Sequence, residues 1–143
     1  MPRTSRIYKP HFYYHIYNRG NNRDAVLKHA EDKQLFINLL YKNIYKTDLR
    51  LIAFCIMDNH FHLIIKTGKN PRIISKFMQS VTISYAMQIN KKYKRVGHVF
   101  QGRYNANILR YKKDLEQVTT YIRKNPVVEG LVKHPKDYPW CKF

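Results

Sequence analysis

The sequence is poor in acidic residues, with 9 Asp and Glu against 27 Lys and Arg, and its formal net charge is +18 over 143 residues. Because Lys and Arg neutralise phosphates, a polyanion is the expected partner. Ribosomal proteins and cationic membrane binders share this excess, so charge alone does not choose among these classes. The chain also has 12 Tyr, 7 Phe and 1 Trp, and rings that can stack on unpaired bases favour single-stranded nucleic acid.

Cysteine is scarce and no long apolar segment is present. Cys55 and Cys141 form no CxxC pair and are too few for a disulfide framework, so a reducing compartment is compatible and neither thiol is predicted to be reactive. The longest apolar run covers only residues 51–57, whereas a bilayer span needs about 20 residues. Residues 1–6 lack the apolar core of a signal peptide. We therefore expect a cytoplasmic protein with no membrane partner.

Repeats and Gly- or Pro-rich linkers are also missing, so residues 1–143 are expected to form a single domain. Apolar spacing and turn residues predict strands over 12–18, 49–57, 60–66 and 104–111, and helices over 31–45, 70–90 and 113–124. Asn70 before Pro71 is the expected start of the second helix, and Pro126 is expected to force Asn125 out of the third. The tail from residue 127 is expected to pack irregularly.

This order of elements is that of the split βαβ, or ferredoxin-like, α+β fold. It predicts an antiparallel sheet with helices on one face, plus a C-terminal helix. Many unrelated functions use this fold, nucleic-acid binding among them, so the fold does not decide the function.

His60 and His62 open the third predicted strand and point to one face of the sheet, because side chains alternate along a strand. Two imidazoles about 7 Å apart can converge on one metal ion. The pair supplies only two ligands, so a further oxygen or nitrogen donor is required. The same spacing fits two ordinary surface or half-buried histidines.

Tyr121 and Asn125 lie four residues apart and share a face of the last predicted helix, beside its apolar stripe. That flank can be reached from an open site. The alternatives are a packed amphipathic tyrosine and an asparagine that caps the helix.

Basic residues fall in clusters along the chain, and tyrosines are interleaved with them. This pattern favours phosphate contacts over a merely solvated surface. The candidate nucleic-acid-binding residues are Arg19, Arg23, Arg103, Tyr104, Lys112 and Arg123. Tyr13, Tyr17 and Tyr104 are candidate stacking platforms for unpaired bases.

Three segments carry a resemblance to a known family: 57–65 (MDNHFHLII), 100–104 (FQGRY) and 121–127 (YIRKNPV). They resemble the single-tyrosine HUH transposases of insertion sequences, in which two histidines flank a hydrophobic residue. The segments 14–23 (YHIYNRGNNR) and 138–140 (YPW) favour the branch of REP-associated tyrosine transposases. The likeness covers nearly the whole chain.

The resemblance implies that Tyr121 attacks a phosphate of single-stranded, hairpin-flanked DNA, leaving a 5′-phosphotyrosine and a free 3′-hydroxyl. It also implies Mg²⁺ or Mn²⁺ held by His60, His62 and Asn125. Family members often carry Pro where Asp58 stands, and a contribution of this carboxylate to the metal stays open. A bacterial or archaeal, nucleoid-associated protein is implied, either a homodimer or a monomer.

Two other functions compete with this interpretation. The first is a non-catalytic binder of structured RNA or DNA in which the histidines and Tyr121 are structural. The second is a ribonuclease or toxin-like enzyme that uses histidine as acid and base and needs no metal.

Overall fold

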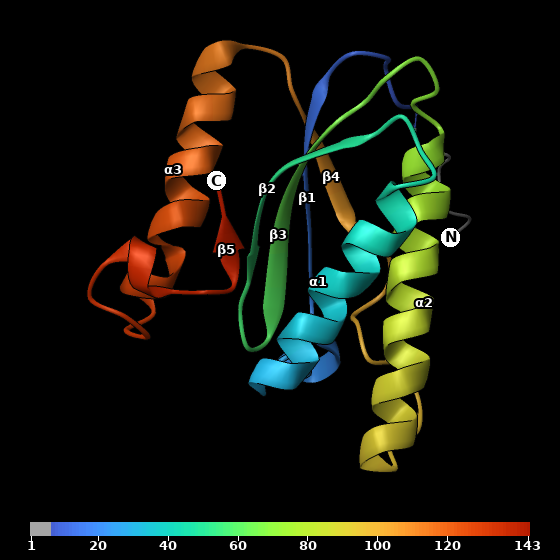
Figure 1. The fold of residues 1–143 in the computed structure, drawn as a ribbon, viewed down its shortest axis with the longest axis vertical. Helices are drawn as coiled ribbons and strands as arrows, with labels where there is room; N and C mark the ends of the chain where they lie inside the picture. The colour runs from blue at the N-terminus through green and yellow to red at the C-terminus, as the bar shows by residue number, and fades with distance from the viewer. Residues whose placement is uncertain (1–6) are drawn as a thin grey trace.

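The computed structural model describes residues 7–143, and in this part of the chain it has one five-stranded antiparallel sheet, in the order β4-β1-β3-β2-β5 (Figure 1). The strands are β1 (Tyr13–Arg19), β2 (Arg50–Ile56), β3 (His60–Lys66), β4 (Asn105–Leu109) and β5 (Cys141–Lys142). The first four are the strands that the sequence predicts, and their order is that of the ferredoxin-like fold. The predicted fold class is therefore confirmed.

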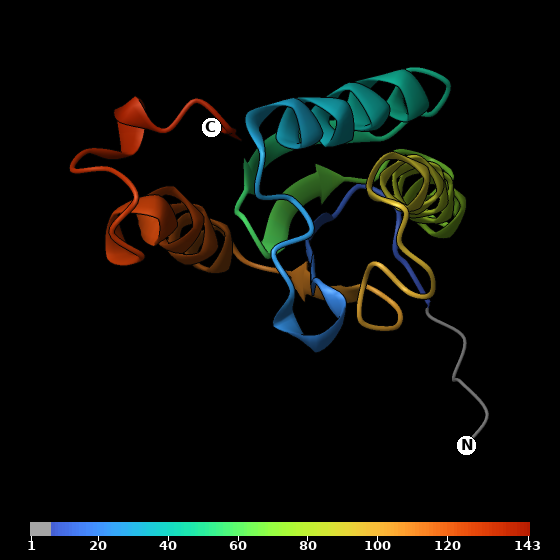
Figure 2. The same ribbon diagram turned by 90° about the horizontal axis from the view of Figure 1, so that it is seen from below.

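Helices cover both faces of the sheet (Figure 2). One face is covered by α1 (Ala30–Ile44) and α2 (Ile73–Tyr93), and the other by α3 (Lys112–Val128). Two short 3₁₀ helices, η1 (Asn21–Arg23) and η2 (Pro135–Asp137), lie in the connecting segments. The C-terminal helix thus has a face of the sheet to itself.

Alternation along β3 divides the interior into two cores. Phe61, Leu63 and Ile65 are fully buried in the larger core with α1 and α2. Ile64 points the other way and belongs to a smaller core that includes Ile122 of α3. Because β-strand side chains alternate, His60 and His62 share the α3 face with Ile64. The amphipathic strand therefore presents both histidines to the last helix.

The ends of two helices differ from the sequence prediction. Arg72, and not Asn70, is the N-cap of α2, so Asn70 and Pro71 lie before the helix. The Asn70 backbone N–H donates to the carboxylate of Asp48 at 2.9 Å. The last helix runs through Pro126 to Val128 and keeps Asn125 inside it. Burial of this last turn against the sheet outweighs the backbone hydrogen bond that proline cannot make.

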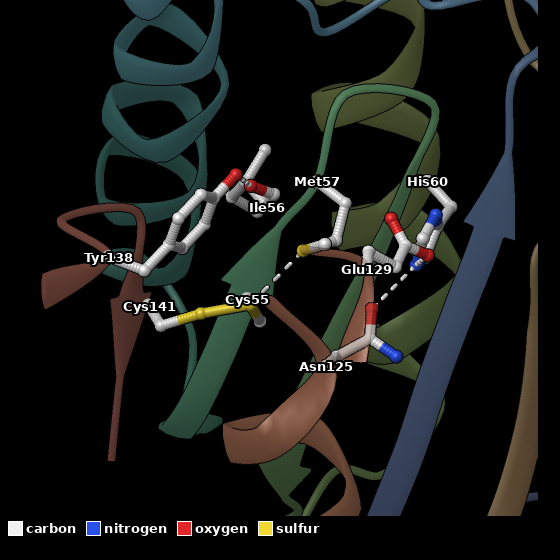
Figure 3. Close-up of a disulfide and its surroundings, with 8 residues drawn as sticks. All are labelled: Cys55, Ile56, Met57, His60, Asn125, Glu129, Tyr138 and Cys141. Atoms are coloured by element: carbon white, nitrogen blue, oxygen red, sulfur yellow. Dashed lines mark hydrogen bonds and ion pairs between the residues drawn. A yellow bond between two sulfur atoms is a disulfide. The ribbon is translucent and has the colours of Figure 1, made fainter. Parts of the chain in front are cut away.

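The C-terminal tail is more regular than predicted, because β5 adds to the edge of β2. Cys141 stands directly opposite Cys55, and a disulfide joins them (Figure 3). Tyr138 holds the tail in place by donating its hydroxyl hydrogen to the Ile56 carbonyl oxygen at 2.6 Å. Two cysteines without a CxxC pair predicted no disulfide framework, and this one bond was not foreseen, since pairing across a sheet edge leaves no trace in local sequence.

None of the helices in residues 7–143 is long and apolar enough to cross a membrane.

Candidate active site

A cleft of about 690 Å³ opens between β1, β3 and α3. It holds eight of the residues predicted from the sequence: Tyr17, Arg19, Arg23, His60, His62, Arg103, Tyr121 and Asn125. The other residues along its wall are Asn18, Asn59, Phe61, Gln101, Asn105 and Glu129. Segments more than 100 residues apart in sequence thus meet at one site.

Each of the two histidines is held on its Nδ1 side. His60 Nδ1 lies 2.7 Å from the amide oxygen of Asn59, the residue before it in the turn that leads into β3. His62 Nδ1 lies 3.0 Å from Nε2 of His15, on the neighbouring strand β1. His62 Nε2 is buried and has no hydrogen-bond partner. His62 Nε2 therefore remains for a ligand, while His60 Nε2 faces a side chain of α3.

Burial keeps His62 and His15 neutral. It lowers the pKa of His62 to about 3, and the nearby charges of His60 and His15 add to this effect. Burial also lowers the pKa of His15 to about 4. Metal coordination requires a neutral imidazole, so His62 needs to lose no proton before it binds a cation near pH 7.

Helix α3 brings three polar side chains to the histidines, because Tyr121, Asn125 and Glu129 are spaced four residues apart on one face. The amide oxygen of Asn125 lies 3.1 Å from His60 Nε2, and Glu129 Oε1 lies 3.8 Å from the same nitrogen (Figure 3). The Tyr121 ring stands edge-on to that of His62, with the centroids 5.7 Å apart. Tyr121 is 57% exposed and lines the cleft, so a substrate can reach this residue.

This donor set fits a divalent cation. A neutral His60 can donate to only one of the two amide oxygens that face it, Asn59 Oδ1 at 2.7 Å from Nδ1 and Asn125 Oδ1 at 3.1 Å from Nε2. When His60 donates to the nearer oxygen, its Nε2 and the Asn125 oxygen face each other as two acceptors that one cation can share. Two ligands of one octahedral ion with bonds near 2.1 Å lie about 3 Å apart, which matches the 3.1 Å contact. In the described residues, no three His, Cys, Asp or Glu side chains are grouped closely enough to hold a metal. The neutral Asn125 amide is thus the best-placed third donor.

Two loops carry the basic rim of the cleft and are joined to each other. Gly20 forms a bridge with Phe100, and the Gln101 N–H donates to the Arg19 carbonyl oxygen. The Arg19 Nε–H donates to the Gln101 side chain at 2.6 Å. Position 20 admits only glycine, because a Cβ there would lie 2.2 Å from the Asp24 carbonyl oxygen. Close backbone packing therefore places the guanidinium groups around the cleft.

The remaining predicted residues lie elsewhere. Tyr104 is buried, with its hydroxyl 2.6 Å from that of Tyr8, so its ring cannot serve as a stacking platform and that prediction is wrong. Lys112 and Arg123 are exposed on α3 but do not line the cleft. Asp58 also lies outside the cleft wall, and its carboxylate forms an ion pair of 2.7 Å with Lys33.

Six polar residues of the site were not predicted from the sequence: His15, Asn18, Asn59, Gln101, Asn105 and Glu129. Asn59 and Glu129 had local signals, since one adjoins His60 and the other continues the four-residue spacing of the helix. His15 and Asn18 had none, because only the pairing of β1 with β3 and the approach of the 99–103 loop bring them to the site.

A profile of the IS200-like transposases matches residues 8–125. This segment contains the whole convergent set of His60, His62, Tyr121 and Asn125. The chain belongs to the IS200-like transposase family.

Individual relatives agree with this membership. A Haemophilus influenzae protein assigned to the REP-associated tyrosine transposases is 28% identical over 102 residues, which are 64% of this chain and 57% of that protein. The chain thus matches little more than half the length of this curated relative. The resemblance to the REP-associated branch is confirmed.

Solved structures share the fold. A REP-associated tyrosine transposase bound to a REP hairpin aligns with a TM-score of 0.80 and 21% identity, covering all of this chain and 83% of the other. A Deinococcus radiodurans protein assigned as a transposase aligns with a TM-score of 0.58 and 18% identity, over 86% of this chain and 97% of that one.

Proposed function

We propose that this protein cleaves and rejoins single-stranded DNA beside a hairpin, through a covalent bond between Tyr121 and the 5′ side of the cut. The observation that carries the proposal is the position of Tyr121, with its ring against His62 and its side chain on the wall of a cleft rimmed by arginines. The other exposed tyrosines, Tyr41, Tyr45, Tyr93 and Tyr111, do not line this cleft.

The chain's own residues can perform the strand cleavage. Arg19, Arg23 and Arg103 would bind the phosphates on either side of the scissile bond. The Tyr121 oxygen would then bond to phosphorus while the bond to the 3′-oxygen breaks. The phenol loses its proton, the 3′-oxygen gains one, and no water is consumed. Rejoining is the same exchange in reverse, with a 3′-hydroxyl attacking the phosphotyrosine.

A divalent cation, Mg²⁺ or Mn²⁺, would be held by His60, His62 and Asn125. When bound, it would neutralise the non-bridging phosphate oxygens and stabilise the charge that develops on the leaving 3′-oxygen. The unpartnered, buried Nε2 of His62 supports this role, as does the facing pair of acceptors on His60 and Asn125. Ligands that are all neutral leave the ion its full charge for the phosphate.

Hairpin DNA with a single-stranded flank is the substrate class that fits best. A REP hairpin is bound in the structure of the relative with the same fold. In this chain, Tyr17 is partly exposed on the cleft wall and is the platform best placed for an unpaired base. Stacking on an aromatic ring contributes about 1–3 kcal/mol per base, which a paired base cannot supply.

The test is a covalent trap on a denaturing gel. Hairpin DNA labelled at its 3′ end is incubated with the protein and Mn²⁺, and the label should migrate with the protein. A strand labelled at its 5′ end should instead release a free labelled fragment. Tyr121→Phe should abolish the adduct, and chelation by EDTA should do the same.

The matched control is Tyr45→Phe, which removes the hydroxyl of a residue that is 89% exposed at the end of α1, on the opposite face of the sheet. This variant should form the adduct as the wild type does. An adduct retained by Tyr121→Phe would refute the assignment of the nucleophile. Tight hairpin binding with no adduct in Mg²⁺ or Mn²⁺ would favour the non-catalytic binder. Cleavage in the presence of EDTA would favour the metal-free nuclease.

A further inference from the structure

His15 is in hydrogen-bond contact with a predicted metal ligand, His62, and has no place in the strand-cleavage chemistry above. It lies on β1, opposite Ile64 in the register, while His62 lies opposite Tyr17. The two histidines are therefore diagonal neighbours on the same face of the sheet. Side chains in this relation lie close enough for long or aromatic groups to meet. Here the two imidazoles meet at 3.0 Å, from His15 Nε2 to His62 Nδ1.

Two neutral imidazoles can share one proton in only two ways. If His15 Nε2 carries the proton, then His62 must hold its own proton on Nε2. That N–H would be buried with no acceptor, which costs about 1–3 kcal/mol, and it could not bind a cation. If His62 Nδ1 carries the proton, His15 Nε2 accepts it, and the Nε2 of His62 presents a lone pair.

The arrangement around His60 follows the same pattern from the other side. The Asn59 amide oxygen, 2.7 Å from His60 Nδ1, can only accept and is closer than the Asn125 amide oxygen, 3.1 Å from Nε2, so the shorter contact favours the Nδ1–H form of that ring. In that form both imidazoles are held by a neighbour at Nδ1, and the Nε2 lone pair of His60 points at the Asn125 amide oxygen. Histidines that bind metals are oriented in this way by a partner at the second ring nitrogen.

We infer that His15 is a positioning residue that holds His62 as its Nδ1–H tautomer and aims the Nε2 lone pair into the cleft. The use of this lone pair for a divalent cation rests on the proposed function. The tautomer itself does not, because it is a property of the protein without metal.

The first measurement is the nitrogen NMR spectrum of the metal-free protein, in which protonated and bare ring nitrogens are well separated. The wild type should show His62 with a proton on Nδ1 and none on Nε2. His15→Phe keeps a ring of similar size but removes the acceptor, so the Nε2–H form of His62 should become populated. A wild-type His62 with its proton on Nε2 would overturn the inference.

The second measurement is Mn²⁺ binding followed by calorimetry in the absence of DNA. Loss of an orienting partner weakens metal affinity by about 10–100-fold, and this loss is expected for His15→Phe. His15→Gln, whose amide oxygen can accept the same proton, should recover most of the affinity. His29→Phe, a matched replacement of an exposed histidine before α1, should bind as the wild type does.

The outcomes separate this inference from the proposed function. Equal Mn²⁺ affinity in the wild type and His15→Phe would overturn the role of His15 even if the covalent adduct forms. If the wild type binds no Mn²⁺ but shows the expected tautomer, the metal part of the proposed function fails and the hydrogen-bond assignment stands. If His15→Phe does not fold, the wild-type spectrum and His15→Gln still decide the question.

Discussion

At the scale of single residues, the cleft joins a buried neutral side to an exposed charged rim. His15 and His62 are almost completely shielded from water, whereas Arg19 and Arg23 are exposed. Arg23 also has a φ of 59°, in the left-handed region that few side chains adopt. A cationic side chain held in an unfavourable backbone conformation at the mouth of a cleft indicates a functional demand on its direction.

The buried histidines should make the stability of the metal-free protein depend on pH. Their pKa values in the folded state, about 3 for His62 and about 4 for His15, lie below the ordinary value of 6.5. The unfolded chain therefore takes up protons first, and stability is lost as the pH falls below 6.5. From pH 7 to pH 5.5 each histidine should account for a loss of about 1 kcal/mol.

Urea unfolding at the two pH values measures this loss. His62→Gln should show a clearly smaller difference than the wild type, because one titrating group has been removed. A wild-type free energy of unfolding that is the same at both values would contradict the prediction.

The charged rim should set the salt dependence of DNA binding. Arg23→Asn removes one cation and keeps a residue that tolerates positive φ. A charged hydrogen bond is worth about 1.5 kcal/mol or more, so affinity for a hairpin with a single-stranded flank should fall roughly tenfold. The slope of log K against log salt should decrease by about 0.7–0.9.

Lys42→Gln is the control for this measurement, since it removes one exposed charge from α1 on the other face of the sheet. Its slope should match that of the wild type. If both variants changed the slope equally, the affinity would come from overall charge and not from the rim of the cleft.

At the scale of elements, the turn between β2 and β3 is tied to α1 by the ion pair of Lys33 and Asp58. The Lys33 side chain is 4% exposed and also donates to the Lys28 carbonyl oxygen at 2.8 Å. The Leu27 N–H donates to the Asp58 carbonyl oxygen. Because this turn leads directly into His60, the tie holds the first histidine of the cleft relative to the helical layer.

Removing Asp58 and removing Lys33 from this ion pair should lower the free energy of unfolding by different amounts. Asp58→Ala leaves a buried ammonium group without its anion, and about 3 kcal/mol of stability should be lost. Lys33→Met keeps an apolar chain of similar length and leaves only the half-exposed carboxylate unpaired, so about 1 kcal/mol should be lost. Urea unfolding of both variants gives the comparison, and a larger loss for Lys33→Met would contradict it.

At the scale of the whole molecule, a single covalent link closes 86 residues of chain between β2 and β5. It holds the C-terminal tail to the sheet beside α3, on the face that carries the cleft (Figures 1 and 3). In the chain-entropy account, closing so long a loop restricts the unfolded ensemble and stabilises the fold by about 4–5 kcal/mol. The disulfide is therefore expected to raise the free energy of unfolding of the entire domain.

Reduction should lower the free energy of unfolding by that amount. Cys141→Ser, at the partly exposed end of the link, should match the reduced wild type and should not respond to dithiothreitol. Cys55 is fully buried and is a poorer site for this test, because a serine there would bury a hydroxyl group. If the urea midpoint of the wild type were the same with and without dithiothreitol, the prediction would be contradicted.

The sequence by itself determined the element order, the fold class and the family. Periodicity and turn residues are local, so β1 to β4 and α1 to α3 could be predicted from short windows of sequence. Alternation along β3 placed His60 and His62 on one face, and the four-residue spacing placed Tyr121 beside Asn125. These are properties of one strand and one helix.

Only the tertiary structure decided which residues meet. The contact of His15 with His62 depends on the register of β1 against β3. The disulfide between Cys55 and Cys141 depends on the pairing of β5 with β2. The burial of Tyr104, which excludes it as a stacking platform, follows from packing beneath α2. Register, edge pairing and burial join segments far apart in sequence, and their energies depend on all of the packed partners, so no local pattern records them.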